Sequence, residues 1–162
     1  MLEPEATMSQ KTDYTDAEWD TLQQLPMMIG MAVAGSSPSG LSGVLNEAMT
    51  TSKVMLEAKQ AGGLLGAIAD STGNPDVRKA LSDAAWKPLE LKAKTLEACK
   101  SAVSIVTAKG TSDEVAGLIA MLNGMASKVA EASKEGGFLG FGGVQVSDTE
   151  KAALAEISSA LG

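Results

Sequence analysis

Residues 111–129 read TSDEVAGLIAMLNGMASKV, which is a helix start followed by an apolar stripe. Thr111 and Glu114 have the spacing of a capping box, in which the threonine side chain accepts a hydrogen bond from the third helical amide and the glutamate accepts one from the threonine amide. The apolar residues that follow recur every three or four positions: Val115, Leu118, Ile119, Leu122, Met125 and Val129. Because this is the period of one helix face, the stretch predicts a long helix with one buried side.

Similar signals mark other helices along the chain. Two more capping boxes, Thr15–Glu18 and Ser147–Glu150, precede apolar runs. The remaining signals are prolines at helix starts and glycines at helix ends: Pro75, Pro88, Gly62, Gly110 and Gly136. Together they predict four long helices and two short ones, with Pro26 kinking or dividing the first. In the second helix, the expected buried stripe includes both Met55 and Leu56.

The composition also favours helices over strands. Aromatic residues make up 3% of the chain, there are 9 methionines, and alanine is abundant. Alanine and methionine favour helices, whereas strands are enriched in β-branched and aromatic residues. We therefore expect an all-α antiparallel helical bundle that forms one domain over residues 14–162. Residues 1–13 are polar and lack periodicity, so we expect them to form a disordered N-terminal tail.

The two halves of the chain resemble each other at an offset of 74 residues. The sequence EAKQAGGLLG at 57–66 aligns with EASKEGGFLG at 131–140. A single αα-hairpin cannot bury its own apolar stripe, but two related hairpins packed together can. We therefore predict two pseudo-repeats, at about residues 14–87 and 88–162, each an αα-hairpin followed by a Gly-rich apolar loop and a short helix.

The composition excludes most catalytic, metal and nucleic-acid chemistry. The chain has no histidine, one cysteine and a formal net charge of −7, with a pI near 4.6. These numbers argue against an imidazole acid–base or metal site and against binding to nucleic-acid phosphates. Cys99 falls on an inward stripe, which predicts a buried thiol. We expect no enzyme, metal site or cofactor; carboxylate or lysine chemistry stays open, but the spacing points to no catalytic pair.

The Gly-rich segment GGFLGFGG at residues 136–143 is a candidate interaction site. One interpretation is a helix end whose apolar side chains close the bundle, and the other is an exposed loop that docks a partner, a second copy or a membrane surface. The candidate interaction residues of this loop and of its counterpart in the first half are Leu64, Leu65, Phe138, Leu139 and Phe141.

A methionine-rich patch is the second candidate. Met27, Met28 and Met31 surround their helix with apolar side chains. The helix is then either buried on every side, or part of it forms an adhesive surface or lines a pocket for an apolar ligand.

The N-terminus has no basic segment before an apolar stretch, so we expect no secretory signal. The longest apolar run, residues 25–34, is far shorter than the roughly twenty residues that a membrane span needs. With a single cysteine, the expected location is the cytoplasm.

The C-terminal stretch, from the GGFLGFGG segment through Val144, Val146 and Ser147 to Glu150, resembles the signature of a family of small uncharacterised bacterial helical proteins. The start of the first helix, TDAEW at residues 15–19, is similar to the start of these proteins. The resemblance implies a bacterial cytoplasmic protein and implies no particular activity.

From these observations we expect a non-enzymatic interaction or structural protein. It would self-associate or dock a protein partner through apolar helix faces and the Gly/Phe loop. The alternative is a small carrier that holds a lipid or another apolar ligand between hairpins that can part. Nucleic acid is not an expected partner, and a membrane surface is less favoured than a protein.

Overall fold

The computed structural model describes residues 7–36, 41–135 and 148–162. The regular structure in these ranges is helical, with no strand, which confirms the predicted all-helical class. The elements are the 3-10 turn η1 (Lys11–Asp13), α1 (Asp16–Gly35), α2 (Leu41–Ala61), α3 (Gly63–Thr72), α4 (Pro75–Ala84), α5 (Pro88–Lys109), α6 (Ser112–Glu135) and α7 (Asp148–Leu161).

Local hydrogen bonds explain where α1 and α6 begin. The Glu18 amide donates to Thr15 Oγ1 at 3.2 Å, and the Thr15 amide donates to Glu18 Oε2 at 2.8 Å. At the start of α6 the Glu114 amide donates to Thr111 Oγ1 at 3.1 Å, and the Thr111 amide donates to Glu114 Oε2 at 2.7 Å. Both predicted capping boxes are therefore confirmed. The third box cannot be followed, because Ser147 lies outside the described residues.

Prolines begin two further helices, as predicted. Pro75 and Pro88 are the first residues of α4 and α5, and Asn74 caps α4 by accepting a hydrogen bond from the Asp76 amide at 2.9 Å. Pro26, in contrast, does not divide the first helix. It is buried within α1, which runs unbroken from Asp16 to Gly35.

The glycine pair that ends α2 is followed at once by another helix, which differs from the expected loop. Gly62 and Gly63 have φ angles of 73° and 65°, which side chains other than glycine rarely adopt. These two residues turn the chain, and α3 begins at Gly63 itself. The apolar residues that we expected in a loop therefore form a helix with an inward face.

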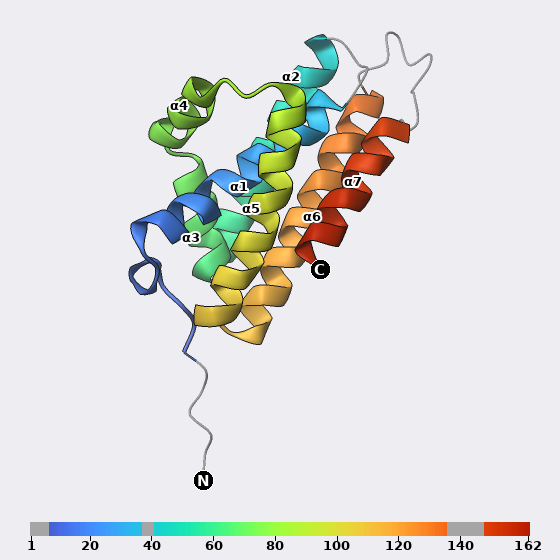
Figure 1. Cartoon of the computed structure of the whole chain (residues 1–162). Coiled ribbons are helices and arrows are strands. Elements are labelled where there is room, and N and C mark those ends of the chain that lie inside the picture. Colours follow the sequence, from blue (N-terminus) through green and yellow to red (C-terminus); the bar gives the residue numbers. More distant parts are fainter. Residues whose placement is uncertain (1–6, 37–40, 136–147) are drawn as a thin grey trace.

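The helices pack around one core (Figure 1). α2 makes its most extensive contacts with α6 and α3, and α1 packs mainly on α5 and α6. α7 lies beside α5 and α6, while α4 contacts α1 and α3 at one corner of the molecule.

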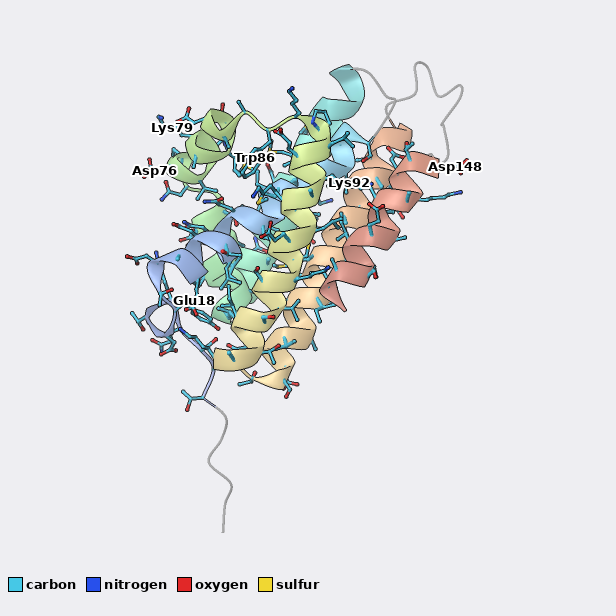
Figure 2. All side chains as sticks on the ribbon, in the orientation of Figure 1. Glu18, Asp76, Lys79, Trp86, Lys92 and Asp148 are labelled. Atoms are coloured by element: carbon cyan, nitrogen blue, oxygen red, sulfur yellow. The ribbon has the colours of Figure 1, made fainter. Side chains whose placement is uncertain are left out.

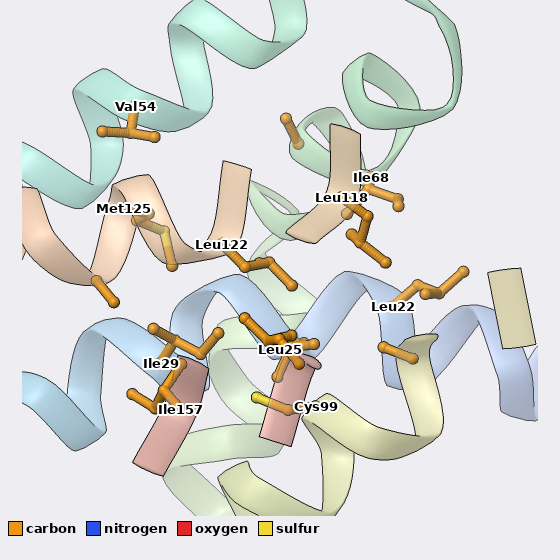
Figure 3. Close-up of a cluster of buried hydrophobic side chains, with 14 of the residues drawn as sticks. Leu22, Leu25, Ile29, Val54, Ile68, Cys99, Leu118, Leu122, Met125 and Ile157 are labelled. Atoms are coloured by element: carbon orange, nitrogen blue, oxygen red, sulfur yellow. The ribbon is translucent and has the colours of Figure 1, made fainter. Parts of the chain in front are cut away.

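The centre of the core is formed by side chains from six of the helices (Figure 3). α1 and α6 contribute most of the fully buried large residues, and burial of each such side chain stabilises the fold by about 1.5–3 kcal/mol. The central residues include Leu22, Leu25, Ile29, Val54, Ile68, Cys99, Leu118, Leu122, Met125 and Ile157.

The N-terminal segment before α1 corrects the predicted extent of the disordered tail. Residues 1–6 lie outside the described residues, but 7–13 are placed, and Lys11–Asp13 form η1. Ser9 is only 6% exposed, because it is bonded to Glu114 at the start of α6. A buried hydrogen bond to a carboxylate thus holds a segment whose composition alone suggested no structure.

Candidate interaction surface

The predicted loop residues of the first half lie on a helix. Leu64 is 1% exposed and belongs to the core, and Leu65 is partly buried against it. Leu64 is therefore a core residue of α3 and not part of an exposed loop, because the helix that begins at Gly63 turns it inward. Phe138, Leu139 and Phe141 lie outside the described residues.

The structure divides the predicted methionine patch. Met28 is 4% exposed and packs with Val77 and Leu81 of α4, and Met27 is partly buried against the same cluster. Met31, in contrast, is 40% exposed. Two of the three methionines thus attach α4 to α1, and one remains at the surface.

Two apolar side chains on α2 form an exposed line that the sequence did not indicate. Met49 is 71% exposed and Leu56 is 56% exposed. They are seven residues apart, about two helical turns, and so lie on one face of α2. Gln60, one turn further along, is also exposed. We call the strip formed by Met49, Leu56 and Gln60 the α2 face.

Leu56 was expected in the buried stripe together with Met55, but only Met55 is buried, at 8% exposure. Val54 and Met55 are both buried, and Leu56, about 100° further round the helix, lies beyond the buried side. The other side of α2 packs against α6, α3 and α1. A Cβ added at Gly30 of α1 would lie 2.9 Å from Thr51 Oγ1, which shows how closely α1 approaches α2 there.

Charged side chains lie along both flanks of the α2 face. On the flank toward α6, Lys128 Nζ lies 3.4 Å from Glu57 Oε2, and Lys53 is exposed one turn before Glu57. On the flank toward α3, Lys59 Nζ lies 2.6 Å from Asp70 Oδ1. The α2 face is therefore an apolar strip between two charged borders.

A surface groove of about 580 Å³ runs beside the α3 flank. Its walls come from α2, the end of α3 and the start of α4, and include Met55, Leu56, Lys59, Ala69, Asp70 and Pro75. Leu56 thus belongs both to the α2 face and to the rim of a groove that an apolar side chain could enter.

A buried polar cluster ties the N-terminal segment to α6. The Ser9 amide donates to Glu114 Oε1 at 2.8 Å, and Ser9 Oγ lies 3.0 Å from that oxygen and 2.7 Å from the Tyr14 hydroxyl. Burial raises the pKa of Tyr14 above its usual value of 10.0. This cluster fixes the position of the N-terminal segment.

Lys109, at the end of α5, connects this cluster with the start of α1. Its Nζ lies 2.5 Å from Glu18 Oε2 and 5.8 Å from the centre of the Tyr14 ring. The hydrogen bond from Lys109, followed by that from the Thr15 amide, lowers the pKa of Glu18 below its usual 4.5. Glu18 lies near the start of α1 (Figure 2).

Cys99 is fully buried among apolar side chains of the core. Burial raises the pKa of its thiol to about 12. At neutral pH the sulfur is therefore protonated and shielded from solvent, so its role is packing, as predicted.

A second surface hollow, of about 260 Å³, lies between α1 and α5 beside Trp86 (Figure 2). Its lining mixes apolar and charged side chains, including Asp20, Met28, Trp86, Lys94 and Glu97. Lys94 and Glu97 lie 3.9 Å apart, and both are more than half exposed, so solvent screens this pair.

Within the described ranges, no group of three or more cysteine and carboxylate side chains is placed to hold a metal ion. No helix in the same part of the chain is both long and apolar enough to cross a membrane. Comparisons with models of protein families, with curated proteins and with solved structures gave no match.

Proposed function

We propose that this protein acts by binding other protein chains, either copies of itself or a partner, and carries out no catalysis. The observation that carries this proposal is the α2 face. Met49 and Leu56 expose most of their surface on one side of a helix whose other side is packed against α6, α3 and α1. Exposed apolar side chains gathered on one face are typical of protein interaction sites.

The proposal is tested by sedimentation of the full chain between about 10 μM and 1 mM, the range in which small interfaces associate. We expect the average mass to rise with concentration, and Leu56→Lys to abolish the rise because it places a charge in the contact. Leu89→Lys on α5 is a matched control, because Leu89 is 82% exposed and lies outside the α2 face. A chain that stays monomeric and retains no protein partner would contradict the proposal.

The pseudo-repeat is part of the same proposal. Helix pairs α1 and α5, α2 and α6, and α4 and α7 begin at residues 16 and 88, 41 and 112, and 75 and 148, close to the expected offset of 74. α1 packs on α5, and α2 packs on α6, as expected if two related antiparallel hairpins pair about an approximate two-fold axis. An experimental structure in which residues 14–87 superpose on 88–162 would test it.

The carrier hypothesis requires the hairpins to separate. Core residues between them, such as Leu25, Ile29 and Leu122, are 0–1% exposed and fill the space that a ligand would occupy. Native mass spectrometry of freshly purified protein distinguishes the two functions, because a carrier would retain the additional mass of an apolar ligand.

A further inference from the structure

We infer that the α2 face binds the α2 face of a second copy of this chain, with the two α2 helices antiparallel and Lys53 of each copy paired with the partner's Glu57. The inference rests on the proposed function and specifies its partner. It follows from where the exposed apolar and charged side chains lie on α2.

The apolar part of the surface is a narrow strip that suits one helix. Met49 and Leu56 are seven residues apart, so the apolar part is about 10 Å long, and Gln60 extends the α2 face with a polar end. Its width is that of a single row of side chains. A second helix laid along this strip would cover Met49 and Leu56 together, as helices do when they pack side by side.

The charges on the α6 flank favour a second copy over another partner. When the two-fold axis is perpendicular to two identical helices, the helices run antiparallel, and each flank faces the same flank of its partner. Lys53 and Glu57 lie one turn apart on that flank and have opposite charges. The antiparallel arrangement therefore places Lys53 against the partner's Glu57, and Glu57 against the partner's Lys53, so the flank is complementary to itself.

The neighbouring residues are compatible with this pairing. Glu57 already lies 3.4 Å from Lys128, so an added lysine from the partner would give that carboxylate two cationic neighbours. The groove of about 580 Å³ on the other flank can receive the partner's apolar side chains beside Leu56. Because few large apolar residues take part, we expect a weak dimer with a Kd of roughly 10 μM to 1 mM.

The test exploits the symmetry of this contact. In Lys53→Glu the four facing side chains all become acidic, and in Glu57→Lys they all become basic, so we expect each variant alone to dimerise about tenfold more weakly than the wild type. An equimolar mixture of the two variants restores both attractive pairs. The double variant with Lys53→Glu and Glu57→Lys also restores them and should dimerise like the wild type.

Sedimentation of the full-length proteins at low salt measures each Kd, and circular dichroism verifies that each variant is folded. Lys100→Glu, at an exposed lysine on α5, is the matched control and should leave the Kd unchanged. Weakening by both single variants with recovery in the mixture supports the inference. If Leu56→Lys abolishes association while the charge variants and their mixture behave like the wild type, this pairing is wrong although the proposed function stands. A wild type that is monomeric at 1 mM and binds no protein overturns both.

Discussion

The capping boxes at the starts of α1 and α6 have the same residues at the same spacing, but their surroundings differ. The Glu18 side chain is 27% exposed and forms an ion pair with Lys109. Glu114 is 5% exposed and accepts hydrogen bonds from Ser9 in addition to that of its own box. The first box contacts one lysine side chain 91 residues away, whereas the second holds a buried segment 105 residues away in the chain. We therefore expect the buried box to contribute more to stability than the box of α1.

The strongest test of this difference is Glu114→Ala. It removes the acceptors of the Ser9 and Thr111 amides and leaves the first buried, and the second partly buried, without that partner. We expect the free energy of unfolding to fall by about 2–4 kcal/mol, measured by urea denaturation. The N-terminal segment should also become sensitive to proteases. An effect no larger than that of Glu18→Ala would show that burial does not distinguish the two boxes.

A second test adds a methyl group next to the buried capping box of α6 and keeps its residues unchanged. A Cβ added at Gly110 would lie 2.8 Å from Glu114 Oε2 and 3.0 Å from the Val106 carbonyl oxygen. Gly110→Ala should therefore destabilise the fold by about 1–3 kcal/mol in thermal unfolding. Gly35→Ala, at the end of α1, is the control, because no atom of the described residues lies within 4 Å of its added Cβ.

Tyr14→Phe tests the link between the N-terminal segment and the buried box. It removes the hydrogen bond with Ser9 Oγ and should cost about 1 kcal/mol.

Tyr14 is the only tyrosine, so its absorbance reports the titration of this one hydroxyl. Its pKa in the folded protein is raised above 10.0, which means that the unfolded chain loses this proton first. The contribution of the protonated Tyr14 hydroxyl to the free energy of unfolding is therefore fully present below pH 10 and is lost as the pH rises above 10. A titration midpoint that does not fall when urea is added would contradict the buried position of the hydroxyl.

The smallest effect is expected for Glu18→Gln in the exposed box. The pKa of Glu18 is lowered in the folded state, so its contribution is present above pH 4.5 and is lost as the pH falls toward the folded-state pKa. The difference in stability between wild type and variant should thus be small at pH 7, decrease with added salt and vanish in acid. If the difference in stability between wild type and Glu18→Gln persisted in acid, the charge of Glu18 would not be the cause of its contribution.

These two boxes also show what the sequence can reveal about this fold. Four adjacent residues suffice to predict a helix start, because both hydrogen bonds are made within one turn. The partner of Glu114 is far away in the chain, and nothing in residues 111–114 indicates that Ser9 covers them.

The α2 face was missed for a related reason. Periodicity placed Leu56 with Met55, but which side of α2 is buried depends on its packing against α6, α3 and α1, which lie elsewhere in the chain. The glycines at 62–63 predicted a helix end correctly. Their φ angles, which let α3 begin without a loop, are not encoded in any pattern that we used.

The exposure of Met49 has a chemical consequence. Its thioether is open to peroxide, whereas Met125, at 0% exposure in the core, is shielded. Oxidants should therefore convert Met49 to the sulfoxide well before Met125, and a methionine sulfoxide reductase would reverse the change. The added oxygen makes the apolar end of the α2 face polar, so oxidative conditions would weaken the proposed association between chains while the folded core stays intact.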